Sequence, residues 1–408
     1  MASEHAKQAF ALRDRVTERE RFYVDSSYYS MATGELEKEL EVYEQWRLAY
    51  PRDPSPLHKL AYCEGFLGRY ERAAAEYDEA LKLEPNDVVN YIDLASTYIV
   101  LNRLDDALDV FHELQARKLE HEYTAEVSYL LAFMRDDTAE MDRLVAAADK
   151  NPESQDILLS SQSDTEALHG RLQKARELLL RAVESAKQNG QEERASEWQV
   201  HAALWEAELG NRATAQRLAT TALPATERKD VPAEAAVAAL ALARAGDVTR
   251  AESLLQDLTR QFPADVWMNR YWLPSIRAAI ELDRHNPAQA IEILQAAKPY
   301  ELGGDPITLD TLYPIYLRGQ AYLMQRNSRA AVSEFEKFLE YRGRVANGVF
   351  GSLAYLQLGR AYMSSSNTPK ARSAYQQFLA LWKDADSDAL LLRQAKTEYS
   401  TLHLQISH

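Results

Sequence analysis

Side chains that could carry out catalysis are scattered along this chain and do not form a recognisable set. None of the nine histidines pairs with another at the four-residue helical spacing of a zinc site. The acidic pairs Asp105–Asp106 and Asp136–Asp137 fall in expected turns, where carboxylates commonly cap helices. The sequence lacks a phosphate-binding glycine loop, the kinase motifs and a Gly-x-Ser-x-Gly nucleophile elbow. We therefore expect no enzyme, no metal site and no cofactor.

Composition and charge narrow the classes of partner. Cys63 is the only cysteine, which rules out an intrachain disulfide and fits a reducing compartment. The 62 acidic and 47 basic residues give a net charge of −15, which disfavours nucleic acid and anionic lipid as partners. No segment has the apolar length of a membrane span, and the first residues show no secretion signal. These features predict a cytoplasmic chain.

The elements that must position any functional side chain repeat with a period of 34 residues. Gly34, Gly68 and Asn102 stand at equivalent points of three similar segments. Apolar residues around them recur at helical spacing, and Gly or Asn suits a left-handed turn. This pattern predicts helix–turn–helix units that bury their apolar faces by stacking. Glu39 stands where alanine is expected, which predicts either a splayed helix pair or a carboxylate that reaches solvent.

The pattern continues less strictly to the C-terminus. Further turns are predicted at Asp136, Gly170, Gly210, Gly246 and His285–Asn286. Unit starts are expected near residues 20, 54, 88, 122, 156, 196, 232, 271, 312 and 352. The predicted regions are 1–19, a partial repeat or capping helix; 20–155, an N-terminal array; 156–311, divergent repeats; 312–385, a C-terminal pair; and 386–408, a capping helix and tail. The first region suggests a chain that begins partway through a longer array, unless it is a simple cap.

The repeats resemble the tetratricopeptide-repeat family over nearly the whole chain. That resemblance implies an all-α fold, a right-handed superhelical α-solenoid of about ten helix pairs plus terminal helices. It also implies a concave groove, lined by the first helix of each pair, that binds a protein or peptide. The repeat register places these residues in the groove: Tyr28, His58, Tyr62, Phe66, Ile92, Ser96, Tyr316, Gln320 and Arg360. The alternative is that many of them only pack between neighbouring first helices.

Three segments show a second resemblance. ALRDRVTERERFYV, PRDPSPLHKLA and KARSAYQQFLALWKDAD are similar to the repeat-rich C-terminal regions of bacterial serine/threonine kinases and transcriptional regulators. This second resemblance implies that the chain is the regulatory arm of such a larger protein and binds a small ligand or a partner. Chaperone-binding family members use Lys and Asn to hold a terminal carboxylate, and His58, Tyr62, Ile92 and Ser96 replace them here. Recognition of such a chaperone tail is therefore not expected.

Two insertions are longer and richer in glycine than a repeat turn requires. They span Lys298–Pro314 and Arg342–Ser352, and Arg342 with Arg344 brings local positive charge to an acidic protein. Loops often carry function, so either insertion could border a pocket for an anionic ligand, or could be a plain connector. The sequence as a whole predicts a non-catalytic scaffold for protein–protein interaction, with the regulatory arm as the alternative. Self-association into a homo-oligomer stays open.

Overall fold

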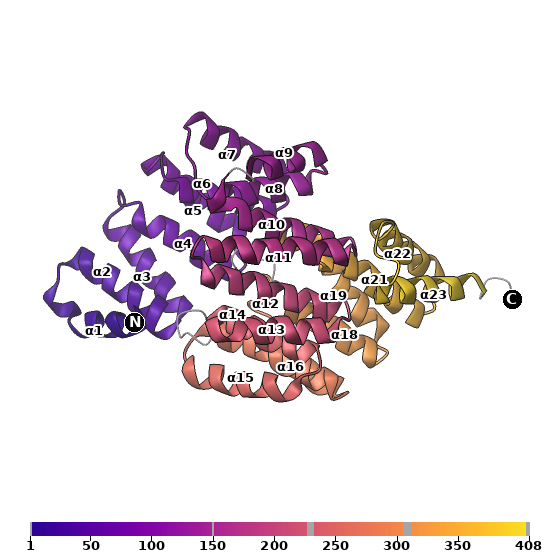
Figure 1. Cartoon of the computed structure of the whole chain (residues 1–408). Coiled ribbons are helices and arrows are strands. Elements are labelled where there is room, and N and C mark those ends of the chain that lie inside the picture. Colours follow the sequence, from indigo (N-terminus) through magenta and orange to yellow (C-terminus); the bar gives the residue numbers. More distant parts are fainter. Residues whose placement is uncertain (1, 149–150, 227–231, 305–311, 405–408) are drawn as a thin grey trace.

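Stacked antiparallel helix pairs build the described part of this protein (Figure 1). The computed structural model describes residues 2–148, 151–226, 232–304 and 312–404, and these residues form helices and no strands. The chain runs from α1 at one end of the molecule to α23 at the other. The predicted all-α superhelical solenoid is confirmed.

The described residues form ten helix pairs. The first helices are α2 (Glu18–Tyr28), α4 (Ser55–Phe66), α6 (Val88–Val100), α8 (Thr124–Met134), α10 (Pro152–Leu168), α12 (Glu192–Glu208), α14 (Pro232–Arg244), α16 (Leu273–Asp283), α18 (Tyr313–Met324) and α21 (Phe350–Ser364). The second helices are α3 (Leu36–Ala49), α5 (Tyr70–Leu83), α7 (Leu104–Ala116), α9 (Thr138–Ala148), α11 (Leu172–Gln188), α13 (Arg212–Thr226), α15 (Val248–Gln261), α17 (Pro287–Ile293), α19 (Ser328–Glu340) and α22 (Thr368–Leu381).

Short and terminal elements complete the array. They are α1 (Ala2–Ala11), η1 (Arg13–Arg15), η2 (Tyr29–Thr33), η3 (Met268–Trp272), η4 (Leu294–Ala297), α20 (Arg342–Val345) and α23 (Leu390–Leu404). The α1 helix packs on α2 through the Phe10 and Tyr28 rings, whose centroids are 3.9 Å apart. At the other end α23 covers the last pair, where Glu398 accepts a hydrogen bond from Tyr375 at 2.7 Å. The division into five sequence regions stays a prediction.

The two helices of each pair are joined by a turn, and one residue of that turn has the left-handed backbone conformation. The φ angles are 66° at Gly34, 72° at Gly68 and 57° at Asn102. The turn residues predicted later in the chain share this conformation: Asp136, Gly170, Gly210, Gly246 and His285. The last two turns place Arg326 and Ser366 there, residue types with no preference for the left-handed conformation.

Small residues allow the paired helices to approach closely. Ala61 on α4 and Ala73 and Ala80 on α5 are at most 1% exposed, and large side chains fill the space around them. The unexpected Glu39 is also buried, with 8% exposure, and Tyr43 Oη donates to its Oε1 at 3.2 Å. The expectation that this carboxylate reaches solvent is wrong, because Tyr43 from the same helix gives it a buried partner. Burial raises the pKa of Glu39.

Candidate functional site

In the C-terminal part of the chain, the segments between one helix pair and the next contact the turns of the N-terminal repeats. We call these segments, each of which follows the second helix of a pair, the C-terminal connectors. The connector after α15 donates a hydrogen bond from Val266 N to Gly34 O at 3.0 Å. The next connector donates from Gly304 N to Gly65 O at 3.3 Å and accepts from Tyr70 Oη at 3.1 Å. A Cβ atom on Gly303 would lie 2.0 Å from Phe66 O, so only glycine permits this approach. These backbone contacts bring residues far apart in sequence together.

Two more connectors close the superhelix further along. Gly343 of α20 lies against the end of α6, where a Cβ atom would be 2.0 Å from Ile99 O. Asn347 Nδ2 donates to Ser161 O of α10 at 2.8 Å. Trp382 Nε1 donates to Leu168 O at 2.8 Å. We refer to all the contacts that these connectors and the two preceding ones make with earlier helix pairs as the closing contacts.

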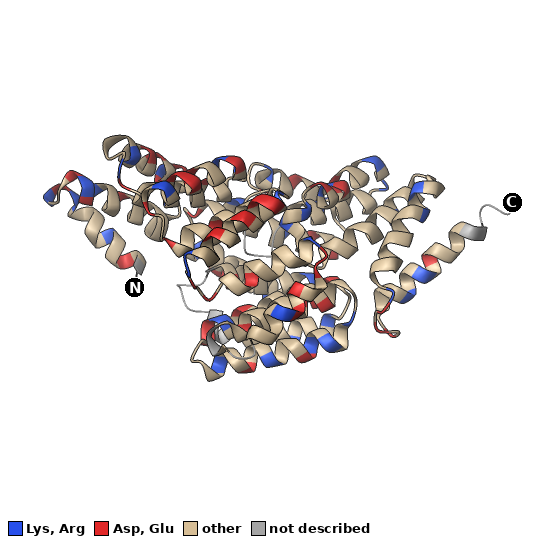
Figure 2. Cartoon of the chain, turned by 90° about the horizontal axis from the view of Figure 1, so that it is seen from above, with Lys and Arg blue, Asp and Glu red and all other residues tan. Residues whose placement is uncertain are grey.

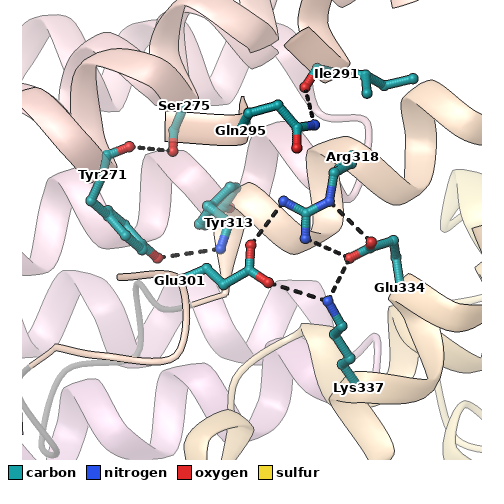
Figure 3. A network of polar contacts seen from close by, with 9 residues as sticks. All are labelled: Tyr271, Ser275, Ile291, Gln295, Glu301, Tyr313, Arg318, Glu334 and Lys337. Carbon is teal, nitrogen blue, oxygen red and sulfur yellow. Dashed lines mark hydrogen bonds and ion pairs between the residues drawn. The ribbon is translucent and has the colours of Figure 1, made fainter. Parts of the chain in front are cut away.

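A buried ionic network holds the Lys298–Gly304 connector in position (Figure 3). Arg318 on α18 is fully buried, and its Nη2 donates to Glu334 Oε2 at 2.7 Å. Its Nη1 lies 2.8 Å from Glu301 Oε2, and Lys337 Nζ contacts Glu301 and Glu334 at 3.2 and 3.0 Å. Glu301 thereby ties the connector to α18 and α19, two residues before Gly303 meets the α4–α5 turn.

The electrostatics of this network favour the ionised forms of Glu334 and Arg318. Burial alone would raise the pKa of Glu334, but the hydrogen bond and charge of Arg318 outweigh it and lower that pKa. Burial alone would lower the pKa of Arg318, and its bonds to Glu334 and Glu301 raise it instead. Arg318 therefore pairs with Glu301 and Glu334 in the interior, while Lys337 is 26% exposed; loss of one partner would leave a buried charge uncompensated.

The open part of the predicted groove lies on α4 and meets a later segment. Tyr62 is 40% exposed, and its ring centroid is 4.8 Å from that of Phe66. Phe66 contacts Trp267 edge to face at 5.2 Å, and Trp267 approaches Tyr300 at 6.5 Å. We call Tyr62, Phe66, Trp267 and Tyr300 the aromatic cluster. Tyr300 Oη donates to Glu37 Oε1 at 2.6 Å, and burial followed by that bond raises its pKa to about 12.

The other N-terminal groove residues have specific partners. His58 Nδ1 lies 2.7 Å from Asn90 Oδ1, and burial lowers the pKa of His58. Tyr28 is half-buried and stacks on Phe10 of α1. Ile92 and Ser96 on α6 are 2% and 3% exposed, and Ser96 Oγ donates to Ile92 O at 2.8 Å. The packing interpretation therefore describes Ile92 and Ser96 better than the groove interpretation.

The C-terminal groove residues are largely covered by the chain itself. Tyr316 is 1% exposed and Gln320 is half-buried. Arg360 Nη2 donates to Glu398 Oε1 of α23 at 2.9 Å, so the capping helix occupies its polar end. The predicted groove residues thus do not share one open surface, because Tyr62 is 40% exposed whereas Ile92, Ser96 and Tyr316 are buried.

The two arginines of the predicted loop site separate in the structure. Arg342 is exposed, whereas Arg344 is 3% exposed, with its guanidinium carbon 5.3 Å from the centroid of the Tyr70 ring. Arg344 Nη2 donates to Gly303 O at 3.1 Å, which links the two insertions. Residues 305–311 of the first insertion lie outside the described residues.

Sequence reasoning missed Trp267, and it named the insertion Lys298–Pro314 without singling out Tyr300. Trp267 begins the WMNRYW segment at positions 267–272, and this run of aromatic residues was the available signal. Basic and acidic residues are interleaved along the helices (Figure 2). Across the described ranges, His, Cys, Asp and Glu form no group of three or more that could hold a metal ion. No described helix combines the length and apolarity of a membrane span.

Two stretches of the chain match models of the tetratricopeptide repeat, residues 67–132 and residues 316–389. They cover α5–α7 with most of α8, and most of α18 through α22. Tetratricopeptide repeats are therefore present in both the N-terminal and C-terminal parts of the array. The match does not extend to a kinase or a transcriptional regulator, so the resemblance to their C-terminal regions stays a prediction. A search of curated proteins finds no match.

Solved structures with a related arrangement of helices have low identity. Yeast Tom70 is 16% identical, with 98% of this chain and 96% of that chain covered and a TM-score of 0.41. The human IFIT1 dimer with PPP-AAAA is 17% identical, with 93% and 87% covered and a TM-score of 0.43. The APC/C hetero-tetramer Cut9–Hcn1 is 15% identical, with 99% and 87% covered and a TM-score of 0.39. Similarity at this level gives no information on what this chain binds.

Proposed function

We propose that this protein is a non-catalytic scaffold that binds a segment of a partner protein at the aromatic cluster. The observation that carries the proposal is the 40% exposure of Tyr62 beside Phe66 and Trp267 on a rigid helical surface. Tetratricopeptide repeats in both halves of the array support a role in protein interaction. Aromatic side chains on preformed helices offer a large contact area at a low cost in ordering entropy.

The proposed surface combines two parts of the array. Tyr62 and Phe66 come from α4, one turn apart on the same face. Trp267 directly precedes η3, and Tyr300 belongs to the connector that Glu301 anchors. An apolar side chain of the partner would pack against the rings, while exposed Lys59 on α4 could pair with a carboxylate of the partner.

Affinity capture with the purified full chain tests this proposal. Proteins retained by the wild-type chain are identified and then titrated against Tyr62→Ala and Leu180→Ala. Leu180 on α11 is 59% exposed and is the matched control. We expect Tyr62→Ala to weaken binding about tenfold and Leu180→Ala to leave it unchanged. If both variants bind the same partners with wild-type affinity, the aromatic cluster is not the binding surface.

A further inference from the structure

A pocket lies where the α4–α5 turn meets the C-terminal connectors. Its volume is about 400 Å³. Residues 68–72 and the end of α6 form one side, and Leu302 with Tyr341 and Arg344 forms the other. The walls come from both halves of the array, so the pocket exists only while the closing contacts hold.

The interior of this junction pocket is mainly apolar. Val100, Leu101 and Leu302 line it together with the rings of Tyr70 and Tyr341. Such a lining favours the burial of an apolar group of a ligand. Two hydrogen bonds to the connector hold the walls in place: Tyr70 Oη donates to Gly304 O, and Arg344 Nη2 donates to Gly303 O.

Two arginines, Arg69 and Arg72, stand on one side of the pocket. Arg69 Nη1 lies 3.0 Å from Glu64 Oε2, and Arg72 Nη1 lies 3.4 Å from Glu64 Oε1. Two guanidinium groups thus share one buried carboxylate. Their side chains are 48% and 69% exposed, so both can turn toward a ligand. Glu71 also lines the pocket and lies 3.4 Å from Arg103, which pairs with Asp106 at 2.8 Å as well.

Glu340 and Arg344 complete the charged groups of the pocket. Glu340 stands on the connector side, at the end of α19. The Arg344 guanidinium rests on the Tyr70 ring and fixes that wall. The arrangement offers an apolar interior with a cationic edge at Arg69 and Arg72.

We propose that the junction pocket binds a small amphipathic monoanion, with its apolar body against Leu101, Leu302 and Tyr341. Its carboxylate, sulfonate or phosphodiester group pairs with Arg69 and Arg72. This proposal goes beyond the scaffold function and does not depend on it. Because the ligand touches both halves of the array, its binding stabilises the closing contacts by mass action.

Two dyes with the same apolar body test the proposal on the full chain. The first is 8-anilino-1-naphthalenesulfonate, a monoanion, and the second is N-phenyl-1-naphthylamine, which has no charge. Fluorescence titration gives Kd for the wild type, Arg72→Gln and the control Arg143→Gln. Arg143 on α9 is exposed and pairs only locally with Glu140.

We expect the sulfonate to bind more tightly than the neutral dye. Arg72→Gln should weaken the sulfonate about three- to fivefold, with the neutral dye and the control variant unaffected. Leu302→Trp should fill the pocket and weaken both dyes, and its thermal unfolding midpoint shows whether it stays folded. If the sulfonate has the same Kd for Arg72→Gln as for the wild type, or if both dyes bind equally, the proposal is wrong.

Discussion

Replacing Gly343 with alanine should loosen the contact between α20 and α6. The added Cβ would lie 2.0 Å from Ile99 O and 2.6 Å from Val100 O, distances that real Cβ atoms do not adopt. To place the added Cβ at least 3.0 Å from Ile99 O, instead of 2.0 Å, the backbone must shift by at least about 1 Å. Helix α6 holds this backbone rigidly. Gly343 lies within the short helix α20, so alanine suits its own conformation and the cost comes from the contact alone.

Overpacking of this kind costs about 1–3 kcal/mol. Local opening of α20 from α6 should therefore become about 5- to 150-fold more frequent. Hydrogen exchange followed by mass spectrometry measures this in peptides covering residues 96–103 and 341–349. We expect faster exchange in both peptides, because each forms one side of the contact, and little change in α14 or α16.

Gly348→Ala is the matched control. Gly348 lies in the same connector, but its nearest neighbour is Val345 O of the same turn at 3.0 Å, with no atom of the N-terminal repeats within 4 Å. Exchange at residues 96–103 should be unchanged in this variant. If Gly343→Ala also leaves exchange there at the wild-type rate, α20 does not hold the end of α6 in solution.

Two further substitutions test the buried charges. Arg318→Met leaves Glu301 and Glu334 with only Lys337 as a cation. The free energy of unfolding, measured in urea, should therefore fall by about 3 kcal/mol. A loss below about 0.5 kcal/mol, as expected at an exposed pair, would contradict the anchoring role. Burial raises the pKa of the Glu39 carboxyl in the folded state. The ionised carboxylate therefore destabilises the wild type at pH values above this folded-state pKa. The wild type regains stability as the pH falls from the folded-state pKa toward the pKa of the unfolded state. The Glu39→Gln variant should therefore melt at a higher temperature than the wild type at pH 8, with a difference that shrinks toward pH 4; a difference independent of pH would refute this reading.

The repeat period predicted most of the local fold because a turn leaves a mark in the sequence. Gly68 and Asn102 adopt the left-handed conformation that their residue types favour. Arg326 and Ser366 adopt it too, held by the helices on either side, and no residue preference reveals them.

The closing contacts could not be predicted in this way. They join the backbone of residues such as Gly65 and Gly304, where neither side chain nor spacing identifies the partner. Ile92 and Tyr316, which fit a groove by register, are buried by neighbouring helices, with the Tyr316 ring packed against Phe335, Phe338 and Phe350. Of the loop arginines, Arg344 does line a pocket, but its position against Tyr70 follows only from the superhelical closure.

The closing contacts also restrict how this protein can change its length. Open repeat arrays tolerate the gain or loss of whole units, because each unit touches only its neighbours. Here Tyr70 meets Gly304 across 234 positions, and Leu168 meets Trp382 across 214. Duplication of one 34-residue unit between α11 and α15 would separate the two partners of every closing contact. The number of units inside the closed part is therefore fixed by geometry, whereas units added beyond α23 or before α1 would leave the contacts intact.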